Sequence, residues 1–491
     1  MVDTSQKGKS AYKDSFKSSI LYSGVQVFQI LIRVIRSKFI AMLLGPSGMG
    51  ITSLLRSTTD LITTTTNLGL KTSGVKSIAS ARADGNKEKI EQTIAVMRVL
   101  VLVTGVVGML ICAFLSPFWS QNSFGNSDYI WSFVGVSILI LTDQINQGEI
   151  ALLQGLQLRR LLAKANIVSQ TISLFTTIPL YFLYGVKAIV PVLVLSSIVA
   201  LCVTEYFVFK AKVRRVKVDF SQVKAIGKAM IILGFFLSLQ HLLSQLSVYL
   251  VRIYVSQTGG LDQVGLYGAG VTIVNMYLGL VFTAMATDYF PRLACTKSQE
   301  ELKTTINNQA EIAFLMFAPI VVAFIIFIKP VIILLYSDKF LPIESMLYFS
   351  MAGTLIKAMA WSLSYSIVAK ASAKAYFYNE VVATIYTFIL NLLGYKYFGL
   401  TGFGFSLILA YTLYLIQVSI VCQRLFNFVF SRKMWALFAS LNVFVVTSLI
   451  IRMKFTDFSN YFIGSILFVL TAILSVYLLN KKMRFFEKRR N

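Results

Sequence analysis

Five basic residues lie inside long apolar stretches of the 491-residue sequence, where an ionised side chain is costly unless it faces water or a partner. They are Arg33, Arg56, Arg98, Arg252 and Lys357. A guanidinium can form bidentate hydrogen bonds with an anion, and an ammonium group acts as a point charge. We therefore predict that four of them, Arg33, Arg56, Arg252 and Lys357, bind an anionic ligand, and that Arg98 lies near a membrane interface.

Each of these positions also has a structural interpretation. Lys357 lies near the middle of its apolar stretch and could pair with an acid on a neighbouring helix. Arg56 precedes Asp60 by one helical turn, so the two could pair on one face, and the surrounding threonines could serve helix packing. Arg33 and Arg252 are close enough to the ends of their stretches for the side chains to reach the headgroup layer. The sequence leaves these alternatives open.

Acids and amides recur at helical spacing in "TDQINQGE". Asp143, Asn146 and Glu149 are three residues apart and therefore share one helical face. Together with Asp60 they are candidates for binding sugar hydroxyls or a coupling cation. The alternative is hydrogen bonding between helices, or an ion pair with Lys357 or Arg56.

A weaker polar group, Gln240, His241 and Gln245, shares another predicted helix and is a further candidate for sugar binding or ion coupling. For His241 we favour a packing role. It is the only histidine, and the four cysteines form no CxxC pair. We therefore expect no metal site, no disulfide and no cofactor, although coupling to H⁺ or Na⁺ is compatible with the acids.

The elements that must position these residues are membrane-spanning helices. The chain is 56% hydrophobic and 14% charged, with a mean hydropathy of +0.72, whereas soluble proteins carry about 25% charged residues. Apolar runs of 18 or more residues recur along its length, each long enough to cross a membrane. We predict an all-α integral membrane protein with about 14 transmembrane helices. They lie near 18–35, 49–70, 94–116, 129–153, 162–182, 188–209, 230–254, 264–288, 309–329, 343–369, 375–395, 400–423, 434–451 and 459–480.

The net charge of +25 is distributed unevenly among the loops. With the N-terminus in the cytoplasm, alternate loops and both tails hold about 33 of the 46 Lys and Arg residues. This bias predicts that both termini are cytoplasmic. Contact with anionic lipids accounts for the remaining excess of positive charge. It leaves no need for nucleic acid as a partner. The N-terminus lacks the pattern of a cleavable signal peptide.

Two segments indicate an internal repeat. "GPSGMGITSLLRSTTD" and "GGLDQVGLYGAGVTIV" each run from a glycine-rich loop into a helix, and they are offset by about 212–215 residues, or six helices. An even number of helices gives both halves the same orientation, so we predict two six-helix lobes followed by two further helices. The predicted divisions are a cytoplasmic tail at 1–17, an N-terminal lobe at 18–210, a basic cytoplasmic linker at 211–229, a C-terminal lobe at 230–424, and the last helices with a basic tail at 425–491.

The stretch "KFIAMLLGPSGMG", the Ser/Thr-rich helix after it and "LGLKTSGVKSIA" resemble Wzx-type polysaccharide flippases. Their superfamily, called MOP, also contains the MurJ lipid II flippases and the MATE drug exporters. The resemblance implies a V-shaped bundle of two lobes, alternating access, and export of undecaprenyl-diphosphate-linked oligosaccharide across a bacterial inner membrane. One departure is the helix number, since many Wzx-type proteins are described with twelve.

The resemblance also bears on residues and partners. In the resembling flippases, arginines on the first two helices contact the diphosphate, which favours Arg33 and Arg56. The implied partners are the lipid-linked oligosaccharide, membrane lipids and the polysaccharide polymerase or assembly proteins. The main alternative is a MATE-type cation-coupled exporter of small molecules, which needs an acidic cavity. An enzyme is disfavoured because the outer loops are short.

Overall fold

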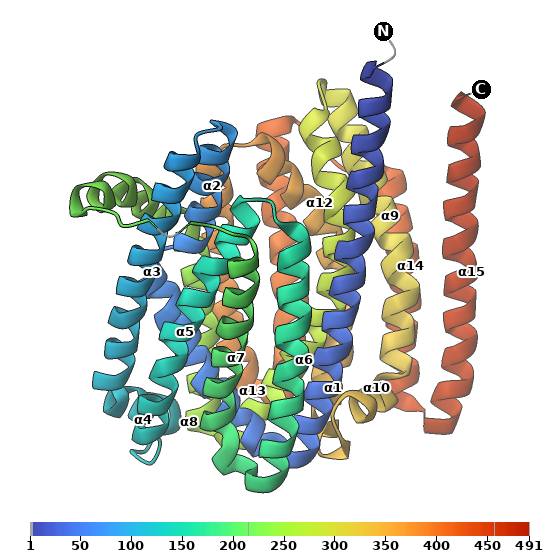
Figure 1. Ribbon diagram of the computed structural model, residues 1–491. Helices are drawn as coiled ribbons and strands as arrows, with labels where there is room; N and C mark the ends of the chain where they lie inside the picture. Colours follow the sequence, from blue (N-terminus) through green and yellow to red (C-terminus); the bar gives the residue numbers. More distant parts are fainter. Residues whose placement is uncertain (1–2, 215, 456, 491) are drawn as a thin grey trace. The chain divides into compact units, whose positions relative to one another are not determined.

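The computed structural model describes residues 3–214, 216–455 and 457–490, and within these ranges the chain is helical without strands (Figure 1). The α-helices are α1 (Asp3–Asn67), α2 (Leu70–Ala83), α3 (Lys87–Phe114), α4 (Ser116–Phe124), α5 (Ile130–Gly155), α6 (Arg159–Tyr184), α7 (Ile189–Lys210), α8 (Phe220–Cys295), α9 (Gln299–Ile326), α10 (Ile328–Leu335), α11 (Glu344–Ala352), α12 (Thr354–Lys370), α13 (Ala373–Phe426), α14 (Arg432–Lys454) and α15 (Asp457–Arg490). Two 3₁₀ helices, η1 (Gly185–Ala188) and η2 (Asp338–Ile343), complete the set.

The distribution of side chains is that of a membrane protein. Large apolar side chains point outward, among them Trp131 and Phe209, which are 82% and 83% exposed. Polar side chains such as Gln144 and Glu149 are buried between helices. A water-soluble domain of this size would bury the first group and expose the second. The prediction of an all-α integral membrane protein is confirmed.

Three of the long helices each contain two membrane crossings. The backbone leaves helical geometry at Gly45 in α1, Gly260 in α8 and Gly399 in α13. With α11 and α12 counted as one crossing, the described residues contain fourteen, in the predicted order. Seven continuous stretches are apolar enough to span a membrane by composition. α1 and α5 are not among them, because they carry the polar residues predicted to form the site.

The internal repeat is visible in the backbone. Gly45 and Gly260, 215 residues apart, both have positive φ with ψ near 180°, at φ 66° and 80°. Gly185 and Gly399, 214 residues apart, share a second unusual conformation, with φ 54° and ψ −131° and with φ 57° and ψ −141°. Glycine alone adopts such values at low cost.

The helices that follow the first glycine break of each half, at Gly45 and Gly260, also repeat in length and order. α3 and α9 are both 28 residues long and start 212 residues apart, and each is capped by a polar side chain that accepts a backbone N–H three residues on. Each is then followed by a short helix, α4 or α10. The six-helix repeat predicted from the sequence is therefore present in the structure.

By packing, the described chain divides into unit 1, residues 1–265, and unit 2, residues 266–491. The first part of α8 belongs to unit 1 because its backbone lies against α1. At the site of Gly265, for example, a Cβ would lie 2.9 Å from the nitrogen of Gly50 in α1, and at Gly234 a Cβ would lie 2.9 Å from the backbone of Gly69, just after α1. The domain boundaries drawn from the sequence, with a linker at 211–229, stay a prediction, although residues from Phe220 onward are helical.

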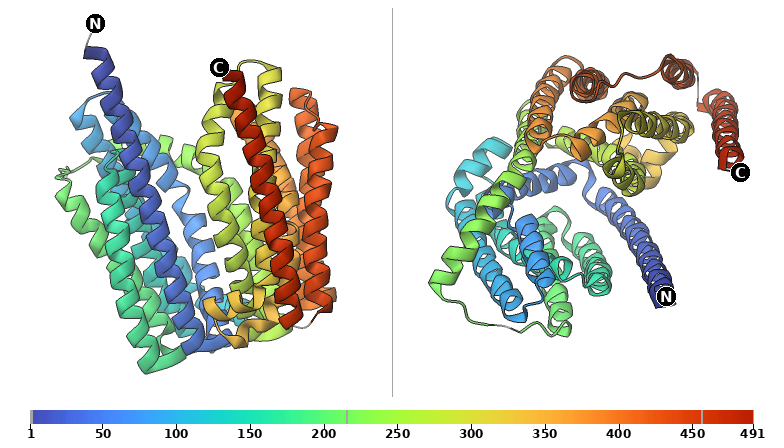
Figure 2. Two further views of the ribbon diagram at one scale, coloured as in Figure 1. Left: turned by 90° about the vertical axis from the view of Figure 1, so that its right-hand side faces the viewer. Right: turned by 90° about the horizontal axis from the view of Figure 1, so that it is seen from above.

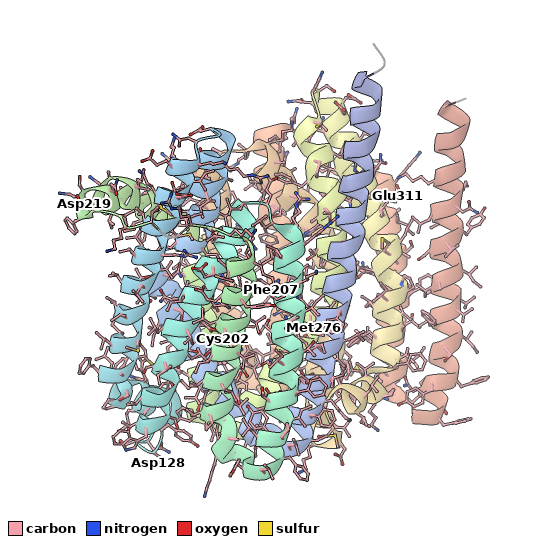
Figure 3. All side chains as sticks on the ribbon, viewed as in Figure 1. Asp128, Cys202, Phe207, Asp219, Met276 and Glu311 are labelled. Atoms are coloured by element: carbon pink, nitrogen blue, oxygen red, sulfur yellow. The ribbon has the colours of Figure 1, made fainter. Side chains whose placement is uncertain are left out.

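Within unit 1 the connections lie at two opposite ends. α2 and the segment before α8 lie at one end and α4 at the other (Figure 1). Asp219 and Asp128, which Figure 3 labels, mark these two ends. This alternation is what the predicted order of crossings requires, and it places the basic segments around α2 and 210–219 together.

The last two helices belong to unit 2. α14 and α15 both pack on α9 (Figure 2). Arg452 on α14 pairs with Glu344, and Lys482 on α15 pairs with Glu311 of α9, which Figure 3 labels. Both ion pairs therefore connect the two additional C-terminal helices, α14 and α15, to helices of the six-helix repeat.

The structure corrects the sequence reading in the connections. The stretch 71–93, predicted as a loop, contains the helix α2, and the short helices α4 and α10 were not predicted. α2 has a low apolar content and lies beside the crossings rather than through the membrane, so hydropathy did not reveal it. α4 and α10 are nine and eight residues long, too short for a periodic signal.

The close approach of α1 and α8 makes a testable prediction. A Cβ at Gly265 would overlap the carbonyl oxygen of Pro46 and lie 2.9 Å from the nitrogen of Gly50. Gly265→Ala should lower the unfolding temperature in detergent, because backbones cannot yield as side chains do, at a cost of about 1–3 kcal/mol or more. Gly279→Ala, in the same helix with open space around it, is the matched control and should be neutral or slightly stabilising. Equal melting of both variants would contradict the close approach.

Candidate anion site

A polar cavity of about 160 Å³ lies inside unit 1 among α1, α5, α6 and α7. Its polar lining consists of Arg36, Arg56, Asp143, Ser169, Gln170, Ser173, Ser196 and Ser197. Two predicted site residues, Arg56 and Asp143, therefore come together from helices that are far apart in sequence. Two positive charges and one negative charge in a hydroxyl-lined space favour a small anionic group that also accepts hydrogen bonds.

Among the described residues, Arg36 has the most buried side-chain polar atoms without a hydrogen-bond partner. Its Nε and Nη2 atoms are buried and have no hydrogen-bond partner among the described residues. Leaving buried donors unpaired costs about 1–3 kcal/mol, and more for a charged group. Because a guanidinium can only donate, the missing partners must be acceptor atoms. Arg56, on the same cavity, is exposed and equally available to such a ligand.

Three further predicted residues surround Asp60 on α1. Its carboxylate lies within Coulombic range of Arg56, Arg252 and His241, the last two from the first part of α8. Arg252 also donates from Nη1 to the backbone carbonyl of Ser53, at 3.4 Å. Arg56 and Asp60 do not form the salt bridge that their spacing allowed. Unit 1 therefore places arginines of α1 and α8 around a single acid.

The helix α5 separates its three predicted polar residues. Asp143 lines the cavity. Asn146, one turn further, has a buried Oδ1 with no hydrogen-bond partner in the described chain. Glu149 forms two hydrogen bonds with Arg98 of α3, from Nε to Oε1 at 2.7 Å and from Nη2 to Oε2 at 2.8 Å. The alternative predicted for Glu149, an ion pair, is therefore found, but its partner is Arg98 rather than Arg56 or Lys357.

The threonine-rich part of α1 serves helix packing. Thr58, Thr64 and Thr65 donate to carbonyl oxygens four residues earlier, at 2.7–2.9 Å. Thr66 accepts from Nε2 of Gln144 at 2.7 Å, which ties α1 to α5. These hydroxyls are already bonded, so the packing interpretation accounts for them. The packing interpretation does not account for the charged side chain of Arg56 in the same segment.

In unit 2, Lys357 lies at the start of α12 beside an interruption at Gly353, instead of in the middle of one continuous helix as predicted. Its Nζ lies 5.4 Å from the ring centre of Phe282 and 5.1 Å from that of Tyr411. No carboxylate pairs with it in the described residues. The ion pair considered for Lys357 is therefore absent there, and aromatic faces stabilise its charge instead.

A second polar group of unit 2 was missed by the sequence analysis. Tyr414 donates to Oε1 of Glu380 at 2.6 Å and approaches Oγ of Ser364 at 2.8 Å. Beside it, Gln417 donates to the carbonyl and the side-chain oxygen of Asn379 at 2.7 and 2.8 Å. The signal was present, since Asn379 and Glu380 stand alone in an apolar stretch of α13.

For the remaining predicted residues, Arg33, Gln240, His241 and Gln245, the described part of the chain shows no side-chain hydrogen bond or ion pair. Arg33 is exposed on α1, one turn before Arg36, so the headgroup interpretation remains open for it. Gln240 and Gln245 are partly buried on α8, and His241 between them is exposed. Arg36, which lines the cavity, was not among the residues predicted from the sequence. Its spacing of three residues from Arg33 puts both arginines on one helical face, and this pattern could have identified Arg36 as a candidate.

The sequence matches a known family and a known relative. The model of the family described as polysaccharide biosynthesis protein matches residues 15–297, which is more than half of the chain. A protein of Shigella flexneri named as a candidate O-antigen transporter is 24% identical over 288 residues, covering 58% of this chain and 68% of that protein. The predicted resemblance is thereby confirmed.

Solved structures share the fold. Lipid II flippase MurJ in an inward closed conformation has a TM-score of 0.72 at 13% identity, covering 95% of this chain and 99% of that one. An inward-facing MATE family multidrug resistance transporter of the MOP superfamily has a TM-score of 0.70 at 16% identity, covering 85% and 98%. A MOP superfamily transporter from Pyrococcus furiosus, whose binding pocket is described as having reverse polarity, reaches 0.58 at 15% identity, covering 86% and 94%.

The membrane-spanning helices, the repeated glycine breaks and the sequence match lead to one assignment: this chain belongs to the polysaccharide biosynthesis protein family and has the fold of the MOP superfamily transporters.

Proposed function

We propose that this protein is a flippase that moves an undecaprenyl-diphosphate-linked oligosaccharide from the cytoplasmic to the outer leaflet of a bacterial inner membrane by alternating access. The oligosaccharide would be the repeat unit of an O-antigen, a capsule or an exopolysaccharide. Membership of the polysaccharide biosynthesis family supports this class of substrate, as does the similarity to an O-antigen transporter. The fold shared with a lipid II flippase supports the type of movement.

The observation that carries the proposal is the unpaired guanidinium of Arg36 beside Arg56 and Asp143. A diphosphate carries about two negative charges and several acceptor oxygens, so it can accept from the donors that the protein leaves free. A cation would instead be repelled by the two arginines. Arg33, Arg252 and Lys357 complete the proposed set of diphosphate-binding residues.

The energetics of the step favour export. An anion that moves outward across an inside-negative membrane gains about 2.3 kcal/mol per charge per 100 mV, provided that protein charges do not move back with it. Protonation of Asp60 or Asp143, or Na⁺ binding there, would reset the carrier. Glu149 is the weaker candidate for this coupling because Arg98 already holds it. The excess of Lys and Arg in alternate loops supports cytoplasmic termini in this scheme.

The proposal is tested with the full chain in liposomes that contain a fluorescent undecaprenyl-diphosphate-linked oligosaccharide. A reagent that reacts with sugar only in the outer leaflet reports its movement. We expect flipping of this lipid, and none of the same polyprenol joined to the sugar without a diphosphate. Movement of a cationic dye without movement of the lipid would support a MATE-type exporter instead. A change in sugar chain length would reveal an enzyme.

A further inference from the structure

A second and larger cleft opens at the end of unit 1 that carries the segment 211–219. It has a volume of about 630 Å³ and lies between α3, α5, α7 and that segment. Charged side chains line it from both sides, namely Arg98, Glu149, Glu205, Arg214 and Lys217. A neighbouring cleft of about 560 Å³ shares Arg98 and Arg214 with it and adds Lys210 and Lys212. The diphosphate site proposed above does not use these residues.

The charges of the two clefts do not cancel. Arg98 is bound to Glu149 through both carboxylate oxygens and also lies within Coulombic range of Glu205. The floor of the cleft therefore holds one guanidinium and two carboxylates, a small negative excess that the basic residues of the segment outweigh. The basic residues of the segment are exposed, and no carboxylate pairs with them in the described chain; they are Lys210, Lys212, Arg214 and Lys217. An anion at the rim would therefore meet several available cations.

The rest of the cleft is lined mainly by apolar side chains. Val99 and Leu102 of α3 line it and are 38% and 49% exposed. Phe209 of α7, which lines the neighbouring cleft, and Phe220 at the start of α8 are exposed aromatic residues, as is common where a helix leaves the bilayer. The Nζ of Lys210 lies 4.5 Å from the ring centre of Tyr206. A ligand that fits must be anionic at one end and apolar at the other.

The depth of the cleft agrees with a lipid headgroup. Glu149 is six residues from the end of α5, and Glu205 is five residues from the end of α7. At 1.5 Å per residue the floor lies roughly 8–9 Å below the helix ends, within the layer of headgroups and first methylenes. Asp143, which lines the smaller cavity, lies about 9 Å further along α5.

We propose that this cleft binds an anionic phospholipid, with the phosphate against Lys210, Lys212, Arg214 and Lys217 and one acyl chain along the apolar face of α3. Basic pockets between transmembrane helices at a membrane surface suit such headgroups. Bound there, the lipid fastens the segment that leads from α7 into α8 onto unit 1. The proposal does not depend on the transported substrate, because none of the four basic residues belongs to the proposed diphosphate-binding set.

The test counts lipids bound to the purified full chain by native mass spectrometry in detergent. The probes are phosphatidylglycerol and phosphatidylcholine with identical acyl chains. Wild-type protein should prefer phosphatidylglycerol, and Arg214→Glu with Lys217→Glu should weaken its binding about fivefold or more. The matched control is Lys76→Glu with Arg82→Glu, which reverses two exposed charges on α2 at the same end of unit 1. The control should keep the wild-type preference.

Three results would overturn the proposal. The first is equal affinity of the wild-type protein for the two phospholipids. The second is an equal loss in the control variant, which would mean attraction by net charge only. The third comes from a parallel titration with undecaprenyl diphosphate. If the cleft variant binds that lipid more weakly but binds phosphatidylglycerol as the wild type does, the cleft is part of the substrate site. Because the assay contains no sugar and measures no transport, its outcome is independent of the flippase proposal.

Discussion

Replacement of Arg36 by alanine is expected to lower the transport rate of the diphosphate-linked sugar about tenfold to a hundredfold without destabilising the protein. The fall corresponds to the loss of charge-assisted hydrogen bonds worth about 1.5–3 kcal/mol. Stability should stay level or rise, because the substitution removes buried donors that the folded protein leaves unpaired. A residue kept for folding would show the opposite pattern, so the pair of measurements separates the two roles.

The experiment combines the liposome assay with thermal unfolding in detergent. Arg36→Lys should be intermediate, since an ammonium keeps the charge but not the planar pair of donors. Arg56→Ala should resemble Arg36→Ala because both side chains line one cavity. Arg160→Ala is the control, an exposed arginine at the start of α6 that does not line it. Normal transport by Arg36→Ala at wild-type protein levels would contradict the proposed anion site.

Hydropathy and glycine placement were enough to predict the order of the helices. In lipid every backbone group must be bonded within the chain, so a run of apolar residues has few alternatives to a helix. The breaks at Gly45 and Gly260 were marked by glycine-rich sequence at a constant offset, which revealed the repeat. The helix α2 was not predicted because its 14 residues contain too few apolar side chains for hydropathy to mark them.

The partners of individual charges were much harder to predict. Sequence spacing shows which residues of one helix share a face, but not which neighbouring helix that face meets. Glu149 was grouped with Asp143, yet the two lie along a helix that contacts different neighbours at different depths. For Lys357 the expected acid was replaced by the rings of Phe282 and Tyr411, whose sequence distance gave no hint of contact. These pairings depend on how the helices pack.

The ion pair between Arg98 and Glu149 makes the second strong prediction. Glu149 is 3% exposed and Arg98 is 21% exposed at the side chain. Glu149→Ala should lower the free energy of unfolding by about 3–5 kcal/mol, because it leaves a largely buried guanidinium without its acceptor. The double variant Glu149→Leu with Arg98→Leu removes both charges together and should recover most of that loss. Thermal unfolding of Glu149→Leu, of Arg98→Leu and of the double variant yields the coupling energy.

The same variants decide between a structural and an ion-coupling role for Glu149. If Glu149 binds a proton or Na⁺ during transport, Glu149→Gln should abolish transport while leaving stability nearly unchanged, and the leucine double variant should be inactive. If the pair only joins α3 to α5, stability should fall in Glu149→Gln and return in the double variant, together with transport. We expect the second pattern, because two short hydrogen bonds already occupy both carboxylate oxygens. Asp143, for which the described residues show no such partner, would then be the acid on α5 that is left for coupling.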